Sequence, residues 1–169
     1  MGSVIMLSGP IGAGKTTVAR ELVAMMNGEV GYIEGDDCWR FLAKSQRDRR
    51  ENFSIIMRSM TAASLPLARS GYDVVLDFTI PAEFLPTAQK ILKDVPIDFV
   101  NFQPSLSVCE HRAANRAEGV ISDYSVYRDF YELFERVGER FCIREDTADA
   151  TVVASRILEG LKAGTFRVA

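Results

Sequence analysis

The stretch Gly9-Pro-Ile-Gly-Ala-Gly-Lys-Thr16 decides the fold, because it fits the pattern G-x-x-x-x-G-K-[ST] at every position. Glycines in such a loop let successive backbone N–H groups turn inward toward phosphate oxygens. The apolar run Val4–Ser8 precedes the loop and a helical pattern, Lys15–Met26, follows it, which is the context that the pattern requires. We therefore expect a phosphate-binding loop made of Gly9, Pro10, Ile11, Gly12, Ala13, Gly14, Lys15, Thr16 and Thr17.

Two side chains of this loop have chemical roles in such a motif. We expect Lys15 to bridge the β- and γ-phosphates as a catalytic cation, and Thr16 to offer its hydroxyl to Mg²⁺. The helix that begins near Lys15 adds the partial positive charge of its N-terminus. The motif thus predicts ATP and Mg²⁺ as cofactors. No N-K-x-D motif occurs, which argues against a Ras-type GTPase, and the chain is short for an ABC or AAA+ motor.

Short apolar runs alternate along the chain with longer stretches of helical periodicity. The runs lack strict polar–apolar alternation, which is typical of strands covered on both faces in a parallel sheet. This order predicts an open α/β sheet with helices on both faces. The expected strands are Val4–Ser8, Val30–Ile33, Asp73–Asp77, Ile97–Phe102 and a weak one near Phe141–Ile143. The expected helices are Lys15–Met26, Asn52–Arg69 with a kink or early end at Pro66, Ala82–Lys93, Ser125–Val137 and a last one capped by Thr147.

Length and composition set further bounds. The 169 residues, of which 47% are hydrophobic, suit a globular protein with a sizeable core, and no linker divides the chain, so we expect one domain over residues 1–169. A net charge of −3 leaves no basic surplus for a long nucleic acid. No apolar run approaches the roughly 20 residues of a membrane helix. The odd, scattered cysteines, Cys38, Cys109 and Cys142, favour free thiols in a reducing compartment, and we expect a cytoplasmic protein of unspecified oligomeric state.

Carboxylates follow the second and third expected strands. One of Asp36 and Asp37, in the loop after the second strand, is expected to face the Lys15 region and either to accept a proton from an attacking hydroxyl or to orient that hydroxyl. The alternative is that Asp36 or Asp37 only caps a helix beginning near Cys38. Asp77 ends an apolar run in the manner of a Walker-B strand, so we expect it to hold Mg²⁺ together with Thr16. A turn aspartate without a metal role is the alternative for Asp77.

The glycine loop, the Gly-Asp-Asp-x-x-Arg after the second strand and the Val-Val-Leu-Asp-Phe-Thr-Ile-Pro after the third resemble the P-loop kinases. Within these kinases, the sequence resembles the group holding phage polynucleotide kinase, chloramphenicol phosphotransferase, the zeta toxins and gluconate kinase. The resemblance implies a P-loop NTPase three-layer sandwich with a five-stranded parallel sheet and a small helical lid. It also implies that Asp36 is the catalytic base, with Asp37 and Arg40 near the substrate. It leaves the acceptor open, because relatives share the scaffold and differ in substrate.

Arg112 and Arg116 lie four residues apart, so we expect them to share one helix face and to repel each other unless an anion lies near them. This arginine-bearing segment resembles the lids of small P-loop kinases. The resemblance implies that residues 112–124 form a lid whose two arginines act catalytically on the phosphates. The alternative is a solvated arginine face paired to Glu110 and Glu118.

These features predict an ATP-dependent phosphotransferase that moves the γ-phosphoryl group to a hydroxyl of a small molecule, with no membrane or long nucleic acid as partner. A nucleotide or 5′-hydroxyl nucleic-acid kinase is one alternative, and a non-catalytic nucleotide-binding regulator is another. Trp39 is expected in the core or stacked on the acceptor, and the basic run at residues 47–50 in a solvated turn or beside the acceptor site.

Overall fold

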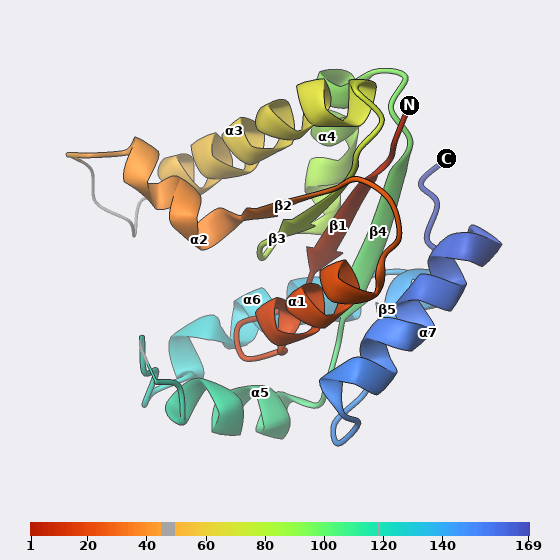
Figure 1. Ribbon diagram of the computed structural model, residues 1–169. Coiled ribbons are helices and arrows are strands. Elements are labelled where there is room, and N and C mark those ends of the chain that lie inside the picture. Colours follow the sequence, from red (N-terminus) through yellow and green to blue (C-terminus); the bar gives the residue numbers. More distant parts are fainter. Residues whose placement is uncertain (45–49, 118) are drawn as a thin grey trace.

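The apolar run before the glycine loop forms β1, Val4–Ser8, at the centre of a parallel sheet (Figure 1). The computed structural model describes residues 1–44, 50–117 and 119–169. The five strands lie in the order β2-β3-β1-β4-β5, and every neighbouring pair is parallel. The remaining strands are β2 Val30–Glu34, β3 Asp73–Asp77, β4 Ile97–Phe102 and β5 Cys142–Ile143. The expected five-stranded parallel sheet is confirmed.

Helices connect the strands and cover both faces of the sheet (Figure 1). The α-helices are α1 Lys15–Met25, α2 Gly35–Cys38, α3 Arg50–Arg69, α4 Leu85–Leu92, α5 Leu106–Ala114, α6 Arg128–Glu135 and α7 Ala150–Ala163. Short 3-10 turns are η1 Trp39–Phe41, η2 Ala82–Phe84, η3 Ser125–Tyr127 and η4 Glu139–Phe141.

Alternating side chains of the central strand feed two separate cores, as the two-residue period of a strand requires. Val4 and Met6 of β1 pack in the cluster that holds the apolar faces of α3 and α4. Ile5 and Leu7 pack in the other cluster, with the apolar faces of α1 and α7. Burial on both faces explains why β1 is a continuous apolar run, and it gives the three-layer arrangement expected from the sequence.

The carboxyl ends of β1, β2 and β3 meet at one edge of the sheet because these strands are parallel and adjacent. The glycine loop leaves β1 at this edge, α2 follows β2, and residues 78–81 follow β3. Ser8 fastens two of these segments together: its hydroxyl donates to the Ile80 carbonyl and accepts from the Ile80 N–H at 2.9 Å. The edge therefore holds the loops in which the sequence analysis placed the functional residues.

Two local expectations are wrong. Pro66 does not end its helix early, because α3 continues through it to Arg69. The carbonyl of Ala62, which loses its helical partner to the proline, belongs to an exposed residue and can be solvated. Thr147 does not cap the last helix; Asp149 does, and its side chain accepts from the Thr151 N–H at 3.0 Å.

The expected lid, residues 112–124, is helical only in its first part. Helix α5 ends at Ala114, and residues 115–117 and 119–124 adopt turns and irregular backbone before η3. Glu118 and residues 45–49 lie outside the described residues. Of the expected basic run, residues 47–50, only the last belongs to the described part, where α3 begins. In the parts of the chain that the structure describes, no helix combines the length and apolar character needed to cross a bilayer.

The C-terminal segment is tied to β4 by a buried ion pair. Arg167 donates to both oxygens of Asp98, at 3.0 and 3.1 Å, and only 2% of the Asp98 side chain is exposed.

The Arg167→Ala variant should lose about 2 kcal/mol of unfolding free energy, since it leaves a buried carboxylate unpaired. Urea unfolding measures this loss. The control is Arg69→Ala, whose exposed pair with Asp94 should contribute less than about 1 kcal/mol; equal losses for both variants would contradict the account.

Candidate active site

The glycine loop curls tightly against helix α5. Gly12 has a φ of +81°, in the left-handed region that favours glycine, and a Cβ there would lie 2.3 Å from the carbonyl oxygen of Cys109. Both the backbone angle and the close approach thus require a residue without a side chain. The loop leads directly into α1, for which Gly14 is the N-cap residue, so the first amides of the helix face the loop.

Lys15 is buried at the centre of the loop, with 8% of its surface exposed. Its ammonium donates to the carbonyls of Gly9 at 3.1 Å and Pro10 at 3.0 Å. Burial lowers the pKa of Lys15 to about 8, and the nearby carboxylate of Asp77 acts in the opposite direction. The loop therefore holds its own lysine through backbone carbonyls, in a place where an anion would bind the ammonium more strongly.

Asp77 lies at the end of β3 with 2% of its surface exposed. Burial raises its pKa, while Lys15 and a hydrogen bond with Thr16 act to lower it. The Tyr32 hydroxyl lies 3.3 Å from Asp77 Oδ2 and also 3.3 Å from Glu34 Oε2. The structure thus brings Thr16 and Asp77 together, which is the arrangement expected of a Mg²⁺ site at the phosphate tail.

Glu34 was not among the residues expected at the site. It is the last residue of β2, is paired in register with Asp77 and lies at the sheet edge that holds the site. Its position at the end of a strand could have identified it from the sequence. Within the described ranges, no three His, Cys, Asp or Glu side chains form a group able to hold a metal ion by themselves. A Mg²⁺ ion here would therefore rely on Thr16, Asp77 and oxygen ligands from a bound nucleotide.

A large cavity of about 970 Å³ opens at this edge of the sheet. Lys15, Thr16, Asp77, Glu34 and Asp36 line one part of it. Asp36 lies in the first turn of α2 and is exposed. Its side chain does not cap that helix, because the N-cap position belongs to Glu34. The cavity therefore holds the phosphate-loop cation and the aspartate expected to act as base.

Asp37 and Arg40 do not line this cavity. Their side chains form an ion pair with each other at 3.5 Å, and 69% and 83% of these side chains are exposed. The expected placement of both residues beside the substrate does not follow from this geometry. One step along a short helix turns neighbouring side chains by about 100°, which separates Asp37 from Asp36.

Arg112 and Arg116 do not share a helix face, because α5 ends at Ala114. Arg116 lines the large cavity with Lys15. Arg112 instead crosses to the glycine loop, donating to the Ala13 carbonyl at 3.4 Å and to the Asp146 carbonyl at 2.9 Å. Glu110 pairs with Arg128 at 3.1 Å rather than with either arginine. The premise of two arginines on one face of a lid helix is therefore wrong.

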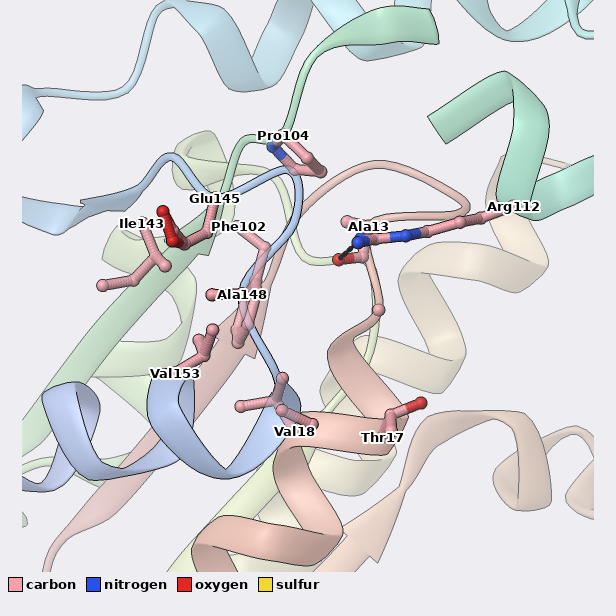
Figure 2. Close-up of a pocket in the computed structure, with 12 residues that line it drawn as sticks. Ala13, Thr17, Val18, Phe102, Pro104, Arg112, Ile143, Glu145, Ala148 and Val153 are labelled. Carbon is pink, nitrogen blue, oxygen red and sulfur yellow. Dashed lines mark hydrogen bonds between the residues drawn. The ribbon is translucent and has the colours of Figure 1, made fainter. Parts of the chain in front are cut away.

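Arg112 lines a second, smaller cavity of about 250 Å³ beside the glycine loop. Figure 2 shows its guanidinium beside Ala13, with Val18 of α1 lying toward Ala148 and Val153 of the chain's last part. Apolar side chains dominate the walls, and Glu145 stands at the edge. The sequence analysis missed this cavity, because residues 143–153 carry no motif.

Trp39 belongs to the core. It is 8% exposed, and its ring lies 5.9 Å from that of Phe53 and 6.5 Å from that of Phe78. It does not line the large cavity.

The close approach at Gly12 gives a matched test with a second glycine. Gly28 has a similar φ of +88°, but a Cβ there would meet no atom within 4 Å. Both alanine variants impose backbone strain, whereas only Gly12→Ala also collides with α5. In denaturant unfolding, Gly12→Ala should cost about 2 kcal/mol more than Gly28→Ala. Equal costs would show that the loop and α5 are not in tight contact.

Comparison with known proteins identifies a family and a shared fold. A family model described as AAA domain matches residues 4–124, which is most of the chain and includes the glycine loop, Asp36, Asp77 and both arginines. No curated protein matches the sequence significantly.

Solved structures share the fold at low sequence identity. The APS kinase of Mycobacterium tuberculosis, in complex with AMPPNP and APS, has a TM-score of 0.72 and 20% identity, covering 95% of this chain and 98% of its own. A sugar kinase from Janibacter has a TM-score of 0.72 and 19% identity over 96% and 95% of the two chains. The tunicamycin resistance protein of Deinococcus radiodurans has a TM-score of 0.72 and 18% identity over 100% and 99%. The chain belongs to the family described as AAA domain, and it shares its fold with these solved kinases.

Proposed function

We propose that this protein is an ATP-dependent phosphotransferase that moves the γ-phosphoryl group to a hydroxyl of a small molecule. The observation that carries the proposal is the shared cavity of about 970 Å³, which is lined by Lys15, Thr16 and Asp77 and also by Asp36. A cavity that holds both a phosphate-binding cation and a free carboxylate suits transfer between two bound molecules.

The two cavities divide the nucleotide between them in this proposal. The phosphate tail lies along residues 9–17, where the backbone amides and the N-terminus of α1 meet it. The base occupies the smaller cavity, with Arg112 alongside. Arg112 then binds or orients the nucleotide from the base side, and Arg116, which lines the larger cavity, is the arginine placed to reach the transferring phosphate. Thr16 and Asp77 would hold Mg²⁺, which would supply positive charge next to the phosphates.

Catalysis of phosphoryl transfer depends mainly on positioning the reacting groups and little on covalent catalysis. Asp36 orients the acceptor hydroxyl and takes its proton while the acceptor oxygen bonds to the γ-phosphorus. The bond from that phosphorus to the β–γ bridging oxygen breaks, and ADP leaves. Lys15 exchanges the carbonyls of Gly9 and Pro10 for phosphate oxygens and stabilises the charge that moves onto them.

The structural neighbours support a small hydroxyl acceptor. They include an APS kinase solved with AMPPNP and APS, a sugar kinase and a shikimate kinase solved with shikimate. These proteins phosphorylate or bind small molecules on the same scaffold. The net charge of −3 supports the same choice over a long nucleic acid.

Exchanging the proposed base separates catalysis from nucleotide binding. The Asp36→Asn variant should keep its affinity for MgATP and lose about 100- to 10,000-fold in the rate of γ-phosphate transfer, since the amide cannot take the proton. Transfer from [γ-³²P]ATP to a panel of sugars, nucleosides and antibiotics measures the rate, and calorimetry measures the affinity.

Asp37→Asn is the matched control, because Asp37 is adjacent in sequence but lies outside the cavity and faces Arg40. Its transfer rate should stay within about threefold of the unchanged protein. Equal loss in both variants would contradict the role of Asp36. Unchanged transfer in Asp36→Asn would do so as well, and ATP binding without any transfer by the unchanged protein would indicate a nucleotide-binding regulator.

Nucleotide binding should depend on pH through Lys15. Its pKa of about 8 in the free protein means that it loses its proton above that pH, whereas a phosphate tail would hold the ammonium charged. Above pH 8 the logarithm of the MgATP dissociation constant should therefore rise by about one per pH unit. Calorimetry in two buffers of different ionisation enthalpy should show proton uptake approaching one per site. Binding that is constant from pH 7 to pH 10 would contradict a lowered pKa of Lys15 that the phosphates raise on binding.

A further inference from the structure

The large cavity extends beyond the phosphate end into a region walled by α3, the segment after β3 and α6. We call this region the acceptor chamber and define it by its apolar lining, Phe53, Met57, Phe78, Val126, Phe130 and Leu133. We propose that the acceptor is a hydroxyl compound that carries a flat apolar group and no anionic group. The proposal rests on the phosphotransferase function above and names the class of its second substrate.

Aromatic rings give the chamber a fixed, flat wall. The rings of Phe53 and Phe78 are stacked, with centroids 4.7 Å apart and an interplanar angle of 26°. Phe130 of α6 meets Phe53 edge-on, at 6.3 Å and 87°. The core residues Trp39 and Phe134 support Phe53 and Phe130 from behind. Rings held in this way present a pre-formed surface to a planar apolar group, and little entropy is lost when that group binds.

Val126 lines the same chamber, and 72% of its surface is exposed. Among the large hydrophobic side chains of the described part of the chain, this is the largest exposed fraction. Single exposed apolar residues are common, but this one is contiguous with the five other apolar residues that define the chamber. A sugar or another fully polar acceptor would bury none of this surface favourably. A molecule with a flat apolar part would cover it and gain the hydrophobic contribution.

The charges of the cavity exclude anionic acceptors. Its described lining includes the carboxylates Glu34, Asp36, Asp77, Glu83 and Asp129, and the cations Lys15, Arg58 and Arg116. Lys15 and Arg116 belong to the phosphate end. In the acceptor chamber, Arg58 therefore stands against Asp36, Glu83 and Asp129. An acceptor carrying phosphate or carboxylate would meet more carboxylates than cations there, while its hydroxyl approaches Asp36.

The neutral polar groups of the chamber complete the description of the ligand. Ser54, Thr79, Thr87 and Tyr127 line it and can donate or accept hydrogen bonds without adding charge. The whole cavity, about 970 Å³, leaves space for a drug-sized molecule next to a triphosphate tail. The acceptor is thus amphipathic: its flat apolar part lies on the phenylalanines, and its hydroxyl-bearing part points to Asp36.

Matched probes test this class directly. Phenyl β-glucoside, methyl β-glucoside and phenyl β-glucuronide share ring hydroxyls and differ in the aromatic group and the carboxylate. A smaller series, 2-phenoxyethanol, ethylene glycol and 2-(4-carboxyphenoxy)ethanol, repeats the comparison. Ligand-observed NMR gives the dissociation constants, with the protein alone and with MgAMPPNP. The neutral aromatic member of at least one series should bind at least about tenfold more tightly than both partners.

Variants locate the binding. Val126→Asp places a charge on the apolar lining without removing a buried side chain, and it should weaken the aromatic probe at least about fivefold. Val152→Asp is the control, because Val152 is also exposed, at 46%, but lies on α7 outside the cavity. Asp129→Lys should reduce the difference between the dissociation constants of the anionic and the neutral aromatic probe. Glu132→Lys changes a residue of the same helix that does not line the cavity, so it should leave this difference unchanged.

The outcomes separate this inference from the phosphotransferase proposal. Preference for the neutral aromatic probe, lost with Val126→Asp and kept with Val152→Asp, supports the inference even before any turnover is found. Stronger binding of the anionic or non-aromatic members, equal effects of the two valine variants, or no binding of any aromatic probe overturns it. Absence of MgAMPPNP binding overturns the phosphotransferase proposal instead, since the probes are also measured without nucleotide.

Discussion

The buried ammonium of Lys15 is the constraint on which the rest of the site depends. A cation with 8% of its surface exposed must have oxygen partners, and the curled backbone of residues 9–16 supplies them through the carbonyls of Gly9 and Pro10. That curl needs Gly12 in a left-handed conformation against α5, and its position needs β1 to be buried between two layers of helices. Asp77 completes the surroundings of the lysine from the neighbouring strand. The local charge balance of the site and the topology of the sheet are therefore parts of one arrangement.

Two cavities on either side of this loop divide the proposed work. The smaller one, beside Arg112, suits a base, and the larger one joins the phosphate end to the acceptor chamber. Their linings differ in kind. The phosphate end gathers Lys15, Arg116 and the carboxylates that face them, while the acceptor chamber combines apolar side chains with neutral polar groups and more carboxylates than cations. Such a division keeps a charged nucleotide and an uncharged acceptor in separate places and lets them meet only beside Asp36.

What the sequence could predict was local or periodic. The glycine loop, the apolar blocks of the five strands and the positions of Asp36 and Asp77 at strand ends all follow from short stretches of residues, and the structure places them at one edge of the sheet. The arginines show the limit of this reasoning, because a four-residue spacing puts Arg112 and Arg116 on one face only if the helix reaches both, and α5 ends at Ala114. The smaller cavity depends on contacts between distant segments, such as Ala13 with Arg112, that no local pattern encodes. The pairing of Asp37 with Arg40 is local, but which of the two aspartates faces the cavity depends on how α2 is set against the sheet.

A crystal structure of the protein with MgAMPPNP tests the central claim most directly. We expect the Lys15 ammonium to have left the Gly9 and Pro10 carbonyls for the β- and γ-phosphate oxygens, with the amides of residues 12–16 turned to the phosphates and the base beside Arg112. A complex in which Lys15 still donates to those carbonyls, with the nucleotide bound elsewhere, would contradict the account.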